Sequence, residues 1–362
     1  MTVPTDPALG GAPVNVSAVI AAMPKAELHL HLDGSLRPET ALELAKSRRI
    51  EAPRSLAGMR GELIAPERGA DQAELLKAFD LPIALMQDAE ALERIAAELV
   101  GAKAADGVRY VEIRWGPLLH TRRGLSLADG IAAVAQGAAG AAGRTGTVVR
   151  LIATALRSHD PGDNVRLAET AARFRDDGLT GWDLAGPEAA FPDPLLHLHA
   201  FEAARAGGLR ITLHAGEWGG AAQVRRALAL DPDRIAHGPG AADDVALMAE
   251  LTARGVTLDL CPTSNVQAGI VASLEDHPLA RLHRAGVPVT LSTDDTTVSD
   301  VTLSEEYRRA VERIGLTLVE LWAIDRRALD VAFADEAALQ PLRDEFDRWA
   351  AGRPELVVAP LR

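Results

Sequence analysis

The chain of 362 residues contains a single cysteine, Cys261, and this scarcity excludes several kinds of site. One thiol cannot form an internal disulfide, a four-cysteine zinc site or a redox pair. A reducing cytoplasm is therefore the expected location. Lysine is also scarce, since it occurs at Lys25, Lys46, Lys77 and Lys103 and nowhere later in the chain. A Schiff-base lysine on any later strand is excluded.

Long apolar runs and basic runs are absent as well. No stretch approaches the roughly 20 apolar residues of a membrane helix, so no membrane partner is expected. The net charge of −13 disfavours a nucleic-acid polymer as a partner. The first residues lack the charged start and apolar middle of a signal peptide, and we expect residues 1–22 and 351–362 to be flexible tails.

Short β-rich segments are what the sequence does contain, and amphipathic alanine-rich stretches separate them. The segments are Glu27–Leu32, Val108–Trp115, Val148–Leu156, Leu179–Ala185, Leu209–Leu213, Arg234–Ala236, Val256–Leu260 and Pro288–Leu291. Strands that alternate with helices indicate a parallel sheet of the α/β class. We expect residues 23–350 to form one (β/α)8 TIM barrel. The competing open, doubly wound sheet would need a glycine-rich turn after its first strand, where this chain has His-Leu-His-Leu-Asp-Gly.

The connection between the first two strands, residues 34–107, is far longer than an ordinary crossover. Its segment Asp71–Leu85 is apolar at helical spacing. One interpretation is a helix packed on the barrel exterior. The other is a helical lid that covers the barrel mouth, as long insertions often do.

Polar side chains stand where the expected strands end, which is where TIM barrels carry their active sites. They are His29 and His31, His214 and Glu217, His237, and Asp294 and Asp295. Residues two apart on a strand point to the same side, so His29 and His31 can both face the barrel axis. Three imidazole nitrogens and one carboxylate oxygen suit zinc and leave room for a water molecule.

The pair His197 and His199 provides an internal comparison, because it lies in a helical pattern. Residues two apart on a helix project about 200° from each other and cannot share one ion. We interpret both as helix residues without a metal. The remaining histidines, His120, His159, His277 and His283, have no partner at a strand end and receive a structural interpretation.

The absence of late lysines also predicts the number of metal ions. Barrel hydrolases with two metals commonly bridge them through a carboxylated lysine on the fourth strand, and here that strand contains none. We therefore expect one Zn²⁺ ion per chain.

Five motifs together resemble the adenosine deaminase family of the amidohydrolase superfamily. They are Lys25-Ala-Glu-Leu-His-Leu-His-Leu-Asp-Gly-Ser-Leu36, His214-Ala-Gly-Glu217, Arg234-Ile-Ala-His-Gly238, Cys261-Pro-Thr-Ser-Asn265 and Ser292-Thr-Asp-Asp295. They occur in the family order, and the resemblance extends from about Met23 to Phe346.

The resemblance implies a role for each matching residue. His29, His31, His214 and Asp294 would be the zinc ligands, with Asp294 also counted as catalytic. Glu217 resembles the acid that protonates purine N1, and His237 the base and charge stabiliser beside the attacking water.

The substrate would be held by a further set of residues in this resemblance. Asp33 would bind a ribose hydroxyl beside His31, Asp295 would bond purine N7, the backbone of Gly186 would meet N3, and Leu76 and Phe79 would belong to an apolar lid. The implied reaction is zinc-dependent hydrolytic deamination at C6 of an aminopurine nucleoside, and adenosine is the first choice.

Departures from the family pattern leave the substrate open. Thr296 stands where the family commonly has proline, and Ser299 where an aromatic residue is frequent. We expect a more polar and roomier rim, which could admit the 5′-extended nucleoside 6-aminodeoxyfutalosine. Adenine is a further alternative, although Asp33 favours a nucleoside because adenine deaminases tend to carry glutamate there.

Other classes of protein remain as remote alternatives. A cyclic-amide hydrolase on the same barrel would favour two metal ions, and a non-catalytic binding protein should have lost a ligand or Glu217, which this chain retains. Zinc deaminases of cytosine bases need more cysteines than this chain has. The oligomeric state is not predicted.

Overall fold

The computed structural model describes residues 14–69 and 72–356, with the side chains of 72–74 left aside. It contains eight strands in one sheet in the order β1 to β8, and every neighbouring pair is parallel. The strands are β1 (Lys25–His31), β2 (Val108–Trp115), β3 (Val148–Leu156), β4 (Leu179–Ala185), β5 (Arg210–Ala215), β6 (Arg234–His237), β7 (Thr257–Leu260) and β8 (Val289–Leu291). The expected β-rich segments therefore all form strands.

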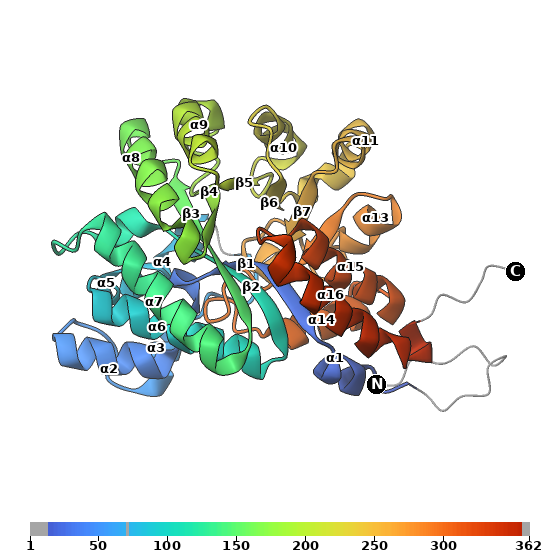
Figure 1. Cartoon of the computed structure of the whole chain (residues 1–362), viewed down its shortest axis with the longest axis horizontal. Helices are drawn as coiled ribbons and strands as arrows, with labels where there is room; N and C mark the ends of the chain where they lie inside the picture. The colour runs from blue at the N-terminus through green and yellow to red at the C-terminus, as the bar shows by residue number, and fades with distance from the viewer. Residues whose placement is uncertain (1–13, 70–71, 357–362) are drawn as a thin grey trace, which may run out of the picture.

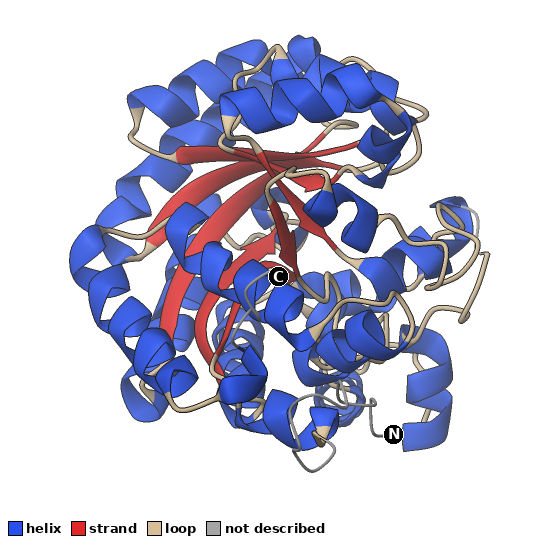
Figure 2. Cartoon of the chain, turned by 90° about the vertical axis from the view of Figure 1, so that its right-hand side faces the viewer, coloured by secondary structure: helices blue, strands red, loops and turns tan. Residues whose placement is uncertain are grey.

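The sheet closes between its first and last strands. The backbone N–H of His31 donates to the carbonyl of Asp294 at 2.7 Å, and the N–H of Asp294 donates to the carbonyl of His29 at 3.1 Å. These bonds place the ends of β1 and β8 side by side. The expected (β/α)8 barrel is confirmed, with the strands gathered in the middle and the helices around them (Figure 2).

Helices cover the outside of the barrel (Figure 1). They are α1 (Val16–Ala22), α2 (Pro38–Arg48), α3 (Leu56–Leu63), α4 (Gln72–Lys77), α5 (Asp80–Leu85), α6 (Ala89–Ala105), α7 (Leu127–Thr145), α8 (Pro161–Ala171), α9 (Leu198–Ala206), α10 (Gly220–Leu228), α11 (Val245–Arg254), α12 (Pro262–Gln267), α13 (Leu279–Arg284), α14 (Leu303–Glu312), α15 (Leu318–Val331) and α16 (Glu336–Ala351). Side-chain caps begin many of them, as Ser126 does for α7 and Thr317 for α15. No helix in the described part of the chain has the length and apolar character to cross a bilayer.

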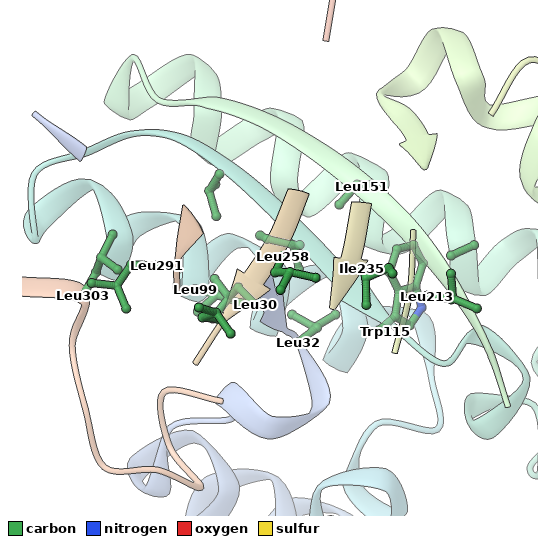
Figure 3. Packing of buried hydrophobic residues seen from close by; sticks show 14 of the residues in the cluster. Leu30, Leu32, Leu99, Trp115, Leu151, Leu213, Ile235, Leu258, Leu291 and Leu303 are labelled. Atoms are coloured by element: carbon green, nitrogen blue, oxygen red, sulfur yellow. The ribbon is translucent and has the colours of Figure 1, made fainter. Parts of the chain in front are cut away.

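The hydrophobic core lies between the strands and the surrounding helices. Figure 3 shows Leu30, Leu213, Ile235 and Leu258 from four different strands, and none of these side chains is exposed to solvent. Burying one such side chain contributes roughly 1.5–3 kcal/mol to stability. This core holds the strand ends, and so the site they carry, in fixed positions.

The inside of the barrel is charged rather than apolar. Arg234 pairs with Glu112 and, at 3.0 Å, with Asp259, and all three side chains are fully buried. Arg114 lies 3.4 Å from Asp183 in the same interior. A buried charge needs such partners, because an unpaired one would lose its hydration without compensation. The network lies beneath the polar strand ends and supports them from below.

The long insertion between β1 and β2 contains helices α2 to α6. Its helix α6 packs along α7 on the barrel exterior. Leu75 and Ala78 instead pack on Ala268 and Val298, which follow β7 and β8. The described part of the segment Asp71–Leu85 forms α4 and α5 rather than one helix, and its Leu75 and Ala78 lie beside connections that follow β7 and β8.

Both expected tails need correction where the structure describes them. Residues 16–22 form α1, in which Val16, Val19 and Ile20 are buried, and this helix contacts α14. Residues 354–356 form a short 3-10 helix whose Leu356 is buried. Apolar side chains with a barrel surface to pack against explain both. The rest of the expected tails, residues 1–13 and 357–362, lies outside the described residues.

Candidate active site

Four side chains from three strand ends converge at the carboxyl end of the barrel. Nε2 of His31 lies 3.3 Å from Nε2 of His29, 3.2 Å from Nε2 of His214 and 3.4 Å from Oδ1 of Asp294. Nε2 of His29 lies 2.9 Å from the same carboxylate oxygen. One ligand atom from each residue can be chosen so that all lie within 4.8 Å of one another.

This donor set fits a zinc ion. Zinc–nitrogen bonds of about 2.0–2.1 Å place neighbouring ligands about 3.3 Å apart, close to the separations observed. Burial lowers the pKa of His31 to about 3, so its imidazole is neutral and has a free lone pair. Three imidazole nitrogens crowded around a carboxylate have no other evident physical reason to meet.

Further groups orient the cluster from behind. Nδ1 of His214 lies 3.1 Å from Oδ1 of Asp183, whose other oxygen accepts a hydrogen bond from Thr154. Burial alone would raise the pKa of Asp183, but His214 and Arg114 outweigh burial and hold that pKa below its usual range. The ionised Asp183 therefore keeps the proton of His214 on Nδ1 and leaves Nε2 free.

Two site residues have unusual backbone conformations. His237, at the end of β6, has φ 66°, and Asp294, after β8, has φ 67°. Left-handed backbone costs non-glycine residues energy and concentrates at functional sites. Here it turns both side chains toward the centre of the mouth, and Ser264 fixes Asp294 with a 2.7 Å hydrogen bond to Oδ2.

Glu217 lies in the turn after β5, where another carboxylate holds the backbone. Glu188 accepts hydrogen bonds from the N–H groups of Gly216 at 2.8 Å, Trp218 at 2.9 Å and Gly219 at 2.8 Å. Burial, together with Asp294 and Glu188, raises the pKa of Glu217 well above its usual value. The Glu217 carboxyl group is thus inclined to carry a proton.

His237 faces the same space as Glu217. Its Nε2 atom lies 3.7 Å from Oε1 of Glu217 and 3.7 Å from Oδ2 of Asp294. Its Nδ1 atom is 3.1 Å from the side-chain amide of Asn265. The acid and the four-residue cluster therefore both lie next to His237.

Asp33 and Asp295 each bring a carboxylate oxygen with no partner into this region. Oδ1 of Asp33 and Oδ1 of Asp295 are buried without a hydrogen bond to the described residues. Burial raises the pKa of Asp33 to about 6. Gly34 is required beside them, because a Cβ there would lie 1.6 Å from Oδ1 of Asp295. Such unsatisfied oxygens are ready to bond a polar ligand.

The other expected substrate contacts, Gly186, Phe79 and Leu76, differ in where they lie relative to the barrel mouth. Gly186 directly follows β4 with φ 102° and so stands at the mouth. Phe79 and Trp218 both pack against the cluster of Leu75, Ala78, Ala268 and Val298. Leu76 is 39% exposed and is not among the described members of that cluster.

The expectation of a roomier rim beside Thr296 and Ser299 stays a prediction. Ser299 is buried, and the N–H of Thr296 donates to Ser35, a bond that proline could not make. A cavity of about 500 Å³ lies beside Glu217 and Trp218, and Ile270 and Arg281 also line it. Within the described residues the space near the site therefore adjoins the ends of β5 to β7.

The other histidines mostly have structural positions. His199 is exposed on α9, and His197 is buried against Asn164, so this pair does not converge. Cys261 is buried, and burial raises the pKa of its thiol, although its Sγ atom lies within 4.8 Å of a nitrogen of His29 and of His237. His277 differs, because its Nε2 lies 3.1 Å from Oδ1 of Asn265, the residue bound to His237.

Sequence reasoning missed the supporting residues. Asp183, Glu188 and His277 were not singled out as functional, although each contacts a residue or turn of the site. The position of Asp183 near the end of β4 was a usable signal. Glu188 and His277 lie in connections whose course the strand pattern does not specify.

Comparison with known proteins identifies the family of this chain. A family model described as adenosine deaminase matches residues 24–349. An adenosine deaminase of Vibrio vulnificus is 37% identical over 327 residues, which cover 88% of this chain and 97% of the relative.

Solved structures agree on the fold. The adenine deaminase of Arthrobacter aurescens superposes with a TM-score of 0.84 at 28% identity, over 91% of this chain and 99% of that one. An amidohydrolase of Burkholderia ambifaria with bound zinc gives a TM-score of 0.84 at 29% identity, over 95% and 96% of the two chains. The chain therefore belongs to the adenosine deaminase family and is a hydrolase of carbon–nitrogen bonds in cyclic amidines.

Proposed function

We propose that this protein is a zinc-dependent aminopurine nucleoside deaminase that converts adenosine to inosine and ammonia. The observation that carries the proposal is the convergence of His29, His31, His214 and Asp294 within 4.8 Å, with His237 placed 3.7 Å from both Asp294 and Glu217. Deamination at C6 needs a water nucleophile, a proton for N1 and a group that holds charge on the incoming oxygen. The four-residue cluster, Glu217 and His237 would meet these three requirements in turn.

His29, His31, His214 and Asp294 would hold one zinc ion. When bound, zinc would lower the pKa of a water molecule to about 7 and so supply a nucleophile near neutral pH. The bound zinc in the Burkholderia ambifaria neighbour supports this metal. The chain has no lysine on β4, which supports a single ion rather than a bridged pair.

Glu217 would donate the proton to N1. A ring nitrogen with a lone pair can only accept, so the group that faces it must carry hydrogen. The raised pKa of Glu217 favours its protonated form. His237, 3.7 Å from Oε1 of Glu217, would hold the oxygen that adds to C6.

Asp33 would bind a ribose hydroxyl, which favours a nucleoside over a free base. Its buried, unpartnered Oδ1 lies 3.8 Å from Nδ1 of His31, so both residues border the same space. Adenine remains an alternative because the Arthrobacter aurescens neighbour is an adenine deaminase. The 5′-extended nucleoside is a further alternative, although Ser299, at the rim beside which its extension would lie, is buried.

A direct comparison of substrates tests the proposal. Purified zinc-loaded protein is assayed for ammonia release from adenosine, 6-aminodeoxyfutalosine and adenine, and kcat/KM is compared. We expect adenosine to be preferred and the metal content to be one zinc ion per chain. Glu202→Gln, which alters an exposed carboxylate, is the matched control for Glu217→Gln. The proposal would be overturned if none of the three compounds released ammonia. A content of two zinc ions per chain would favour a cyclic-amide hydrolase.

A further inference from the structure

We infer that Asn265 and His277 are positioning residues that fix the tautomer of His237, so that its Nε2 atom presents an N–H to the cavity. The inference deepens the proposed function, and its site is the same. The series of hydrogen bonds begins at the backbone N–H of Leu279, which can only donate. Two side chains, those of His277 and Asn265, then pass that direction on to His237 through three successive hydrogen bonds.

The first bond is at the start of α13. The backbone N–H of Leu279 donates to Nδ1 of His277 at 3.2 Å. A backbone N–H can only donate, so Nδ1 of His277 carries no hydrogen. The single proton of this imidazole is therefore on Nε2. Burial keeps the ring neutral, since it lowers the pKa of His277 to about 3.

The second bond determines the orientation of Asn265. Nε2–H of His277 lies 3.1 Å from the Asn265 side chain, and the atom there must be the carbonyl oxygen. With Oδ1 turned to His277, the NH2 group of Asn265 is turned to His237. The assignment thus follows from the Leu279 backbone and does not depend on an arbitrary choice of amide orientation.

The third bond sets the tautomer of His237. The NH2 group of Asn265 lies 3.1 Å from Nδ1 of His237, which must accept and so carries no hydrogen. The proton of neutral His237 is therefore on Nε2. Both residues are shielded from bulk solvent, because Asn265 is fully buried and His237 is 1% exposed.

An N–H at Nε2 changes what His237 can do. This atom is the one that faces Glu217 and Asp294. As a donor it can stabilise negative charge on the oxygen added to C6. It has no lone pair with which to accept a proton from water, so the role of base implied by the family resemblance does not fit this tautomer. His277 bonds Asn265, and Asn265 bonds His237. His277 therefore acts through Asn265 and not by contact with substrate.

The decisive variant is Asn265→Asp, which is nearly isosteric. A carboxylate accepts from both neighbours, so the proton of His237 should transfer to Nδ1 and leave Nε2 without hydrogen. We expect the ¹⁵N spectrum of histidine-labelled, zinc-loaded protein to change from the Nε2–H to the Nδ1–H pattern for His237, assigned by its loss in His237→Gln. We expect kcat to fall roughly 10²-fold or more with little change in KM, as for other wrong tautomers.

A matched pair at His277 provides the second test. His277→Gln keeps a donor for Asn265 and should retain the His237 signal and most of kcat, whereas His277→Leu removes the donor and should lose both. An Nδ1–H pattern for His237 in the unaltered protein would overturn the inference, as would an unchanged spectrum in Asn265→Asp or equal kcat in the His277 pair. The spectra do not depend on turnover, so inactivity on every substrate would refute the proposed function alone.

Discussion

The carboxylate of Glu188 holds the backbone on both sides of Glu217. It accepts one hydrogen bond from Gly216, just before Glu217, and two from Trp218 and Gly219, just after it. Glu188 comes from the connection after β4 and is only 3% exposed. The position of the proposed acid is thus set by a residue from a different connection.

The contact between Glu188 and the turn around Glu217 predicts that Glu188→Gln lowers kcat only when Glu217 is present. Glu188→Gln replaces an acceptor with an NH2 group and loses a bond of the charged kind, worth about 1.5–3 kcal/mol. We expect kcat to fall about tenfold, since about 1.4 kcal/mol corresponds to one decade. In a Glu217→Gln background the same change should have no further effect on kcat.

The double-mutant cycle is read from kcat, with the melting temperature and zinc content measured in parallel. Equal losses in both backgrounds would show that Glu188 acts by a route other than Glu217. Glu202→Gln is the exposed control.

The raised pKa of Glu217 predicts the alkaline side of the pH profile. The acid must be protonated, and burial with Asp294 and Glu188 raises its pKa. As pH rises through that pKa the protonated fraction falls, so kcat/KM should decrease on the alkaline side. Glu217→Gln should lower kcat by roughly 10²–10⁴ and lose this limb. An alkaline limb that persists unchanged in Glu217→Gln would assign it to another group.

The contact between Asp183 and His214 predicts that Asp183 increases the affinity of the site for zinc. Asp183 accepts the Nδ1 proton of His214 at 3.1 Å, and loss of such a partner typically weakens metal binding by about 10–100-fold. We expect Asp183→Asn to release zinc to a competing chelator at lower concentration. Thr154→Val, which removes only the hydroxyl bond to Asp183, should have a smaller effect.

Chelator competition followed by a zinc indicator measures this effect without turnover. Asp176→Asn, whose side chain is 93% exposed, is the control. Unchanged zinc affinity in a folded Asp183→Asn protein would contradict the expectation.

Asp33 predicts discrimination between nucleoside and base. If its carboxylate binds a ribose hydroxyl, Asp33→Ala should raise KM for adenosine by about tenfold, within the range of a lost hydrogen bond to a charged group. Activity on adenine, which has no ribose, should change little. The two substrates are compared by steady-state kinetics. Equal losses on both would place Asp33 elsewhere in the reaction.

Asp325 predicts how stability depends on pH away from the site. Burial raises its pKa to about 7 from the usual 3.8, although Ala26 and Tyr307 donate hydrogen bonds to it. The folded protein therefore binds this proton more tightly than the unfolded chain, and stability should fall as pH rises from about 4 to about 7.

Asp325→Asn removes that titration. Relative to the unaltered protein, its free energy of unfolding should increase across the window by at most roughly 4 kcal/mol, at about 1.4 kcal/mol for each pKa unit. Urea denaturation at several pH values measures the difference. A constant difference between the two proteins would show that Asp325 does not titrate there.

The sequence by itself determined the barrel and the residues at its strand ends. Alternation of β-rich and helical segments depends on local chemistry. His29, His31, His214 and Asp294 each lie near the carboxyl end of such a segment. Because the carboxyl ends of parallel strands meet at one edge, their positions in sequence were sufficient to place them together. The comparisons with known proteins confirm the family that these motifs indicated.

Only the tertiary structure decided which groups support them. Glu188 and His277 lie in connections, and their contacts span 28 residues to Gly216 and 12 residues to Asn265. No local period specifies where a connection runs, so such contacts cannot be read from spacing. The same reason explains α1: whether Val16 and Ile20 are buried depends on the surface that α14, far along the chain, provides.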